Sequence, residues 1–356
     1  MRNKTIIIDR HICDGEKNKI ELEVNYHHNT EIIYLHVTEY IGDIFSSHEK
    51  YIETIKQINE SLKNNNNKLY VVFGGYDSYR YKILQKLDLS EIEFLWWPTF
   101  LLHYTFFMMK KKYGEIKKVN PTFNKHFISY NQKPKQHRAM FIDLMFKHKL
   151  NDYGIFSWNE LTNEWSNNYK FKFWDEKIVR LDINQDRDFL DVRKDYFTEY
   201  IYNHGCLFNI VGESVDNNDM FFITEKTYKN LLIGQPIICI GSPYQNKILK
   251  NLGFKIYENL INYSFDEEIL IEDRVLGVVK ILDKLKNKNP KELYELIKDD
   301  TFYNMENCDR ILEKDNYIPQ KLVELYKDYP TAFKNFNDSY MGVDEYINEI
   351  FQFVNK

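Results

Sequence analysis

Residues 206–241 of the chain read CLFNIVGESVDNNDMFFITEKTYKNLLIGQPIICIG. The apolar run at 206–211 has the composition of a buried strand, and a polar loop follows it. Thr224 is a suitable N-cap for a helix that ends at Gly234, and the run at 236–240 predicts a second buried strand. The stretch therefore predicts a strand, a loop, a helix and a strand in succession, which is the repeating unit of a parallel α/β sheet.

Charged residues gather at the start of the predicted helix, where Glu225 and Lys226 occupy the first turn. Backbone N–H groups at this position lack intrahelical partners and the helix dipole is positive, so a phosphate or another anion is favoured there. Lys226 would add a positive charge, and Glu225 an acceptor for sugar hydroxyls. An ordinary capped helix with a solvated Glu-Lys turn has the same pattern, and on the pattern alone it is the more common case.

The order and spacing of this stretch resemble the donor-site signature of the α1,3-fucosyltransferases, and more loosely that of the exostosin-type glycosyltransferases. The matching parts are Glu213-Ser214, the sequence FITEK at 222–226, a helix ending in Gly234, and the sequence PII at 236–238. The resemblance covers 36 of the 356 residues. Gly212 stands where the family has an aromatic residue, and the Asn that follows the Glu in the family is missing here.

Composition limits the classes of protein to which the chain can belong. With 356 residues, 43% of them hydrophobic, it can form one large or two ordinary domains. A net charge of -5 gives no basic excess that would indicate a nucleic-acid partner.

The four cysteines form no Cys-x-x-Cys pair, which predicts free thiols in a reducing compartment. No apolar stretch approaches the ~20 residues of a transmembrane segment, and no signal peptide is evident, so we expect a cytoplasmic protein.

The abundance of Asn, Lys, Ile and Tyr is typical of an AT-rich coding sequence. A viral or low-GC bacterial source would account for it, and a viral protein would then act in the host cytoplasm.

Strands and helices alternate in the first third of the chain. We expect strands at 4–8, 31–37, 68–73 and 91–97, and helices at 48–64, 79–88 and 100–112. Ligands of parallel sheets bind at the carboxyl ends of the strands. The loop after the second strand contains Glu39, and the loop after the third contains Asp77. Either carboxylate could serve as a general base that takes a proton from an acceptor hydroxyl.

A second α/β unit is expected from residue 124 onward, after the polar segment 117–122. The strand 126–130 leads into a basic segment at the start of a helix, which contains Lys133, Lys135, His137 and Arg138. The helix dipole disfavours cations at this end, so a bound anion would account for them. A solvated basic loop is the alternative. An arginine offers two parallel donors to a diphosphate, and in the fucosyltransferases an Arg after the equivalent strand contacts the nucleotide diphosphate. Arg138 is the best match to that residue.

Beyond the quoted stretch, the pattern predicts a helix at 244–252, a short strand at 254–257 and helices with charged faces from 267 onward. The resemblance implies a GT-B-like α/β fold, in which two Rossmann-like domains face each other across a cleft. Residues 1–118 would form the acceptor-side domain, and residues 124–341 the domain that binds a nucleotide sugar. A last helix at 342–354 could pack on the first domain.

The resemblance implies a glycosyltransferase that is inverting and needs no metal ion or other cofactor. Its donor would be a nucleoside-diphosphate sugar, with a fucose-like sugar linked to GDP as the donor that the resemblance implies. Its acceptor would be a hydroxyl of a glycan or glycoconjugate. A transferase of the same fold that uses a UDP-sugar is one alternative, and a catalytically inactive module that binds a nucleotide sugar or a glycan is another. A transferase that modifies nucleic acid is a third, which the acidic net charge disfavours.

The resemblance also assigns roles to residues. Arg138 and Lys226 would bind the diphosphate, and Glu225 would bind the ribose. Glu213 would lie near the donor sugar as a catalytic candidate, in addition to the possible general bases in the first domain. The other candidates for nucleotide binding are Thr224, Asn131 and Ser214.

Overall fold

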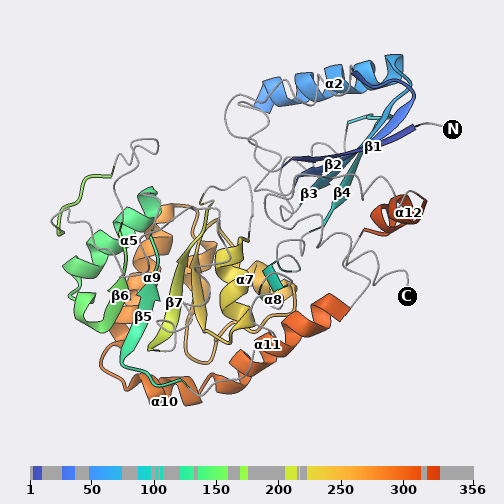
Figure 1. Cartoon of the computed structure of the whole chain (residues 1–356). Coiled ribbons are helices and arrows are strands. Elements are labelled where there is room, and N and C mark those ends of the chain that lie inside the picture. The colour runs from blue at the N-terminus through green and yellow to red at the C-terminus, as the bar shows by residue number, and fades with distance from the viewer. Residues whose placement is uncertain are drawn as a thin grey trace, which may run out of the picture. The chain divides into compact units, whose positions relative to one another are not determined.

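The computed structural model of the chain divides into two compact units (Figure 1). One unit consists of Met1–Phe107, Asp219–Phe222 and Leu312–Lys356, and the other of Met108–Asn218 and Ile223–Ile311. The residues that the structure describes are 3–9, 26–36, 48–73, 87–97, 102, 105–106, 109, 121–131, 135–158, 169–174, 205–214, 216, 223–313 and 319–328.

The first unit contains a parallel sheet with the strand order β1-β2-β3-β4. Its strands are β1 (Asn3–Asp9), β2 (Thr30–His36), β3 (Lys68–Phe73) and β4 (Ile92–Trp96). Helix α2 (His48–Asn64) connects β2 to β3, and α12 (Gln320–Asp328) belongs to the same unit. In this unit, strands that follow one another in the chain are therefore neighbours in the sheet.

The sequence of α2 accounts for its position and its end. Ile55, Ile58 and Leu62 recur at helical spacing and are buried, so they form one apolar face. The helix is followed by a run of asparagines, in which Asn66 adopts a left-handed conformation with φ 53°. Asparagine tolerates this conformation better than most residues, so the asparagines at 64–67 allow the helix to end at Asn64. The predicted helix 48–64 is confirmed.

The second unit contains another parallel sheet, with the order β6-β5-β7-β8. Its strands are β5 (Lys125–Ser129), β6 (Gly154–Phe156), β7 (Cys206–Gly212) and β8 (Ile237–Ile240). From β5 the chain moves to β6 on one side, and then returns to β7 on the other side. The direction of strand addition reverses between β5 and β7, which makes their carboxyl ends a topological switch point.

The strands of the second unit are connected and covered by helices (Figure 1). The α-helices are α5 (Gln136–Lys147), α7 (Glu225–Leu232), α8 (Gln245–Asn251), α9 (Ile271–Leu285), α10 (Pro290–Glu295) and α11 (Lys298–Glu313). Short 3-10 helices lie at η2 (Asn151–Tyr153) and η3 (Tyr263–Glu267). Helices α5 and α7 are the ones that begin beside the switch point, because each follows one of its two strands.

From Phe208 onward, the side chains of β7 alternate between two environments. Phe208 and Ile210 belong to the hydrophobic core that also contains buried residues of α5 and α9. Asn209 points the other way, and its Nδ2 donates to Oδ1 of Asn230 in α7 at 3.0 Å. This alternation is the period of a strand, and it places Glu213, two residues beyond Val211, on the α7 side of the sheet.

Most of the predicted elements that lie on described residues are confirmed, including the strand, helix and strand of residues 206–241. The mixed α/β class with parallel sheets is confirmed as well. The predicted strand at 254–257 is wrong. The Oδ1 of Asn304 accepts from the N–H of Lys255 at 2.7 Å and its Nδ2 donates to the carbonyl of Lys255 at 2.9 Å, so one side-chain amide replaces a neighbouring strand.

The predicted helix at 342–354 lies outside the described residues, as does most of the one at 79–88. Of the helix expected at 100–112, the described residues Leu102, Thr105, Phe106 and Met109 are helical and buried. Among the described helices, none combines the length and apolar character needed to cross a membrane.

Candidate functional site

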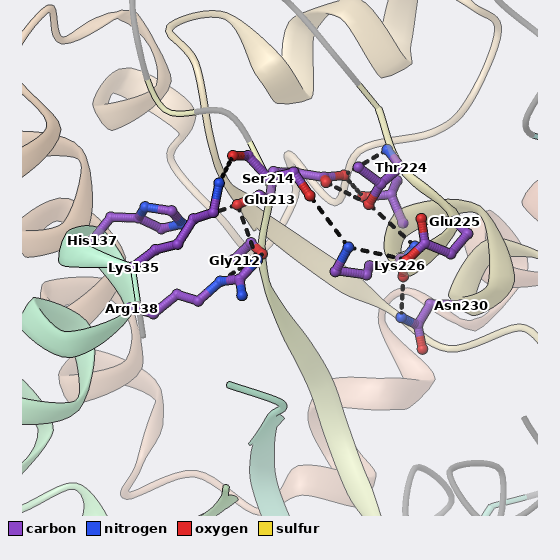
Figure 2. Close-up of polar contacts among 11 residues, drawn as sticks. Lys135, His137, Arg138, Gly212, Glu213, Ser214, Thr224, Glu225, Lys226 and Asn230 are labelled. Atoms are coloured by element: carbon purple, nitrogen blue, oxygen red, sulfur yellow. Dashed lines mark hydrogen bonds and ion pairs between the residues drawn. The ribbon is translucent and has the colours of Figure 1, made fainter. Parts of the chain in front are cut away.

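Polar side chains converge at the carboxyl ends of β5 and β7 (Figure 2). The end of β7 continues into Glu213 and Ser214, and the residues after β5 lead to the start of α5. The first turn of α7 lies against the same segment, because Glu213 is hydrogen-bonded to it. The quoted stretch and the basic segment after β5, which are far apart in sequence, therefore meet at one edge of the sheet.

Glu213 connects the end of β7 to the first turn of α7. Its carboxylate is fully buried and accepts hydrogen bonds from the N–H of Thr224 at 3.2 Å, from the hydroxyl of Thr224 at 2.6 Å and from the hydroxyl of Thr227 at 2.5 Å. Burial raises the pKa of Glu213, and the charge of Lys226 and the bonds from the two threonines oppose this. The carboxylate is therefore a structural anchor for α7, with no face open to solvent.

The first turn of α7 presents its charges beside this anchor. Thr224 has the extended conformation of an N-cap, and its hydroxyl oxygen accepts from the N–H of Lys226 at 3.3 Å. The Nζ of Lys226 lies 3.3 Å from Oγ of Ser214 and 3.0 Å from Oε1 of Glu225. The side chains of Lys226 and Glu225 are 31% and 39% exposed, so a ligand can reach both of them.

Lys135 approaches the same serine from the start of α5. It precedes the first helical residue in an extended conformation, and its Nζ donates to the carbonyl oxygen of Ser214. The first turn of α5, Gln136 to Arg138, contains no acidic residue. Two lysines from two helix starts thus meet at Ser214, and we call Lys135, Ser214 and Lys226 the lysine site.

Arg138, in the first turn of α5, holds the end of β7. It is buried, its Nε and Nη2 donate to the carbonyl of Gly212 at 3.1 and 2.6 Å, and Nη2 also lies 3.2 Å from the carbonyl of Glu213. Gly212 permits this contact, because a Cβ there would lie 2.9 Å from Cγ of Arg138. The observed contacts of Arg138 support the strand end, and its contact with a diphosphate stays a prediction.

His137 joins the loop after β7 to the start of α5. Its ring is fully buried, with Nδ1 2.7 Å from Oδ2 of Asp216 and Nε2 3.1 Å from the carbonyl of Glu213. Burial lowers the pKa of His137, although Asp216 opposes this shift. Burial acts to raise the pKa of Asp216, but the hydrogen bond and charge of His137 outweigh it and hold that pKa below its usual value.

Arg274 of α9 is a site residue that the sequence analysis missed. Its Nε donates to the carbonyl of Gly241 at 2.9 Å, its Nη1 to those of Glu268 and Ile269 at 2.6 and 2.8 Å, and its Nη2 to that of Asp216 at 2.7 Å. One buried guanidinium thereby holds three loops together at the carboxyl edge of the sheet. An arginine within the apolar stripe of a helix was the available signal, because the buried residues Val278 and Leu282 follow Arg274 at helical spacing.

Asn131 lies at the same edge, since it follows β5 by two residues. It is buried, and its Nδ2 lies 3.1 Å from Oγ and 3.3 Å from the carbonyl of Ser129. The carboxylates proposed as general bases, Glu39 and Asp77, lie outside the described residues, and so does Lys133 of the basic segment. Of the candidates in the second unit, the structure brings together Arg138, Glu213, Ser214, Thr224, Glu225 and Lys226. The general base stays a prediction.

Comparison of the chain with protein-family models, with curated proteins and with solved structures finds no match. Within the described part of the chain, no three His, Cys, Asp or Glu side chains are grouped so that they could hold a metal ion. The function is therefore inferred from the chemistry of the site. Two half-buried ammonium groups, the N-terminus of an eight-residue helix and a serine hydroxyl form an environment suited to an anion with several oxygens.

Proposed function

We propose that the chain is a glycosyltransferase, and that its second unit binds a nucleoside-diphosphate sugar at the carboxyl ends of β5 and β7. The observation that carries this proposal is the convergence of Lys135 and Lys226 on Ser214 at the topological switch point of a parallel sheet. Ligands of open α/β sheets bind at such points. The resemblance of residues 206–241 to the fucosyltransferase signature supports the same location independently of the geometry.

The chemistry of sugar transfer requires a stabilised leaving group. When the bond between the sugar and the diphosphate breaks, negative charge develops on the diphosphate, and prearranged positive groups lower the barrier. Lys135, Lys226 and the N-terminus of α7 would supply these groups. Glu225 lies beside Lys226 and is partly exposed, so its carboxylate can accept hydrogen bonds from the ribose hydroxyls.

The buried side chains of Glu213 and Arg138 would contribute by holding the partly exposed residues of the site in position. Glu213 fixes the first turn of α7, and Arg138 fixes the end of β7 that carries Ser214. We therefore assign Glu213 and Arg138 as residues that position α7 and the end of β7, whereas Lys226 would contact the diphosphate. Preorganisation of this kind keeps the ammonium groups in place before the donor arrives.

The finer features of the proposal follow the resemblance. They are a GT-B arrangement of the two units, a fucose-like sugar carried by GDP, and a glycan hydroxyl as acceptor. Transfer would invert the anomeric centre without a required metal ion, and Glu39 or Asp77 would accept the proton of the hydroxyl. A UDP-sugar as donor leaves the role of the lysine site unchanged.

A thermal-shift experiment with the full chain tests donor binding. The diphosphates of guanosine, uridine, adenosine and cytidine are added in turn, with and without EDTA, to the wild type and to Lys135→Met and Lys226→Met. Lys250→Met is the matched control, because Lys250 pairs with Glu258 on the exposed surface of α8. We expect one diphosphate to stabilise the wild type by about 2.7 kcal/mol at a hundred times its Kd.

The stabilisation should shrink in Lys135→Met and Lys226→Met and persist in Lys250→Met. A folded wild type that none of the four diphosphates stabilises would contradict the proposal. Release of the same diphosphate from its sugar conjugate, with and without glycan acceptors, then separates an enzyme from an inactive binding module. Binding without turnover would favour the inactive module.

A further inference from the structure

Exposed apolar side chains gather on two loops next to the lysine site. Tyr244 is 37% exposed, Ile269 56% and Leu270 61%, although side chains of this size are usually buried. Tyr244 lies in the turn after β8, and the other two residues immediately precede α9, with Leu270 as its N-cap. We call these three residues the apolar rim.

Specific contacts tie the apolar rim to the switch point. The N–H of Tyr244 donates to the carbonyl of Asp266 at 2.6 Å, which joins the two loops. Arg274 bonds to Gly241 and Ile269 in these loops, and also to the carbonyl of Asp216 in the loop after β7. The rim and the lysine site are therefore held in one network.

The distances along the chain are short. A Cβ built on Gly241 would lie 3.1 Å from Cβ of Glu213, the residue that precedes Ser214. Tyr244 follows Gly241 by three residues, so the chain between them spans at most about 11 Å. The apolar rim and the anion-binding groups are consequently close enough to contact different parts of one small ligand.

The backbone of Tyr244 has an unfavourable conformation that the surrounding contacts enforce. Its φ of 63° and ψ of 16° are left-handed, which is rare for a large side chain. The bond to Asp266 and the ammonium of Lys247, 5.4 Å from the ring centre, accompany this conformation. Unfavourable backbone conformations persist where the fold enforces them, and they occur often at ligand sites.

We propose that the apolar rim is the subsite for the base of the nucleotide, with the ring of Tyr244 as its stacking surface. This inference rests on the proposed function, because it assigns the second half of the ligand whose diphosphate the lysine site would bind. A nucleoside diphosphate has a charged end and a flat aromatic end. The lysine site matches the first by charge, and the rim matches the second, since every base has a face that stacks on an aromatic ring.

Calorimetric titration of the full chain can separate the two halves. Inorganic pyrophosphate probes the lysine site alone, and the diphosphates of guanosine, uridine, adenosine and cytidine probe both parts. Tyr244→Asn removes the ring but keeps a residue that tolerates the left-handed conformation, and Tyr244→Phe retains the ring. Leu270→Ser removes an apolar side chain at an N-cap where serine is favourable, so the helix should persist. Phe173→Ala, an exposed ring elsewhere in the same unit, is the control.

For the nucleoside diphosphate that binds best, we expect Tyr244→Asn to weaken affinity roughly 5- to 150-fold, the range typical of a lost base-stacking ring. Leu270→Ser should weaken it less, and Tyr244→Phe and Phe173→Ala should match the wild type. Affinity for pyrophosphate should be the same in all of these proteins.

Unchanged nucleotide affinity in Tyr244→Asn would overturn the inference, and so would an equal loss of pyrophosphate affinity, which would indicate a structural role. A wild type that binds nucleotide no more tightly than pyrophosphate would overturn it as well, while the lysine site would stand. Failure of the wild type to bind either ligand would remove the proposed function, and the base subsite with it.

Discussion

At the scale of single residues, the site is built around the buried carboxylate of Glu213, which accepts its hydrogen bonds from uncharged donors. Glu213 receives its bonds from one backbone N–H and two threonine hydroxyls, and Lys226 acts on it only through its charge. A buried polar group that loses a partner costs more than the bond itself contributes, because the remaining group stays desolvated. The threonines around Glu213 are therefore predicted to matter more for stability than other buried threonines.

Thr227→Val tests this prediction. The valine fills the same space but removes a hydroxyl that donates to Glu213 at 2.5 Å. We expect a loss of about 1–3 kcal/mol in the free energy of unfolding, measured by urea denaturation. Thr301→Val is the matched control, because the hydroxyl of Thr301 donates to an uncharged acceptor, the carbonyl of Ile297, which immediately precedes α11. Its removal should cost about 1 kcal/mol or less. Equal losses in both variants would contradict the special role of the carboxylate.

Glu213 should also make stability depend on pH. Burial raises its pKa in the folded state, so the folded protein binds the proton more readily than the unfolded chain does. The contribution to stability is therefore fully present below the ordinary pKa of a glutamate, and it is lost as the pH rises through the raised folded value. Glu213→Gln does not titrate, so the free energy of unfolding of the wild type relative to this variant should fall across that window. A difference that is constant or rises with pH would show that the pKa is not raised.

At the scale of elements, α7 is a short helix whose two ends are both specified. Thr224 caps its start, and Gly234 follows its end with φ at +70°. Eight residues form a marginal helix in isolation, so these ends and the packing of buried residues such as Tyr228 and Leu231 hold it in place. Because Lys226 is positioned by this helix, the stability of α7 and the geometry of the lysine site are linked.

Gly234→Ala should destabilise the protein for two reasons, and Gly253→Ala separates them. Gly253 is also left-handed, with φ at +88°, but a Cβ there would make only an ordinary contact, 3.4 Å from Asn307. Its substitution should cost about 1–2 kcal/mol for backbone strain alone. A Cβ on Gly234 would lie 2.5 Å from Sδ of Met305, so its substitution should cost a further 1 kcal/mol or so for repacking. Thermal unfolding of both variants measures the difference, and a smaller cost at Gly234 would be the contrary result.

At the scale of the whole molecule, the chain forms two compact units, each with its own parallel sheet and its own buried residues. Leu62 is fully buried in the first unit and Phe127 in the second. Each unit can therefore lose core packing independently. The candidate residues that the structure brings together all belong to the second unit.

Hydrogen exchange detected by mass spectrometry tests whether the two units unfold separately. Phe127→Ala should lower the stability of the second unit by about 3–5 kcal/mol, and Leu62→Ala that of the first by about 2–5 kcal/mol. We expect Phe127→Ala to accelerate exchange in β5, β7 and β8 while β2 and β3 keep the wild-type rates, and Leu62→Ala to do the reverse. Equal acceleration in both sheets for either variant would indicate a single cooperative unit.

The local elements around residues 206–241 were predictable from the residues alone, because apolar runs, an N-cap and a glycine act over a few neighbouring residues. The sequence also identified α2 with its correct ends. It could not reveal the switch point, because the position of β7 beside β5 depends on pairing across about 80 residues of chain. It missed Arg274 for the same reason, since the carbonyl groups that bind this arginine come from three separate loops. The burial of the side chains at the site could not be predicted, because burial depends on which segments of the folded chain pack together. Glu213 and Arg138 are buried in the structure, whereas Lys226 and Glu225 are partly exposed and accessible to a ligand.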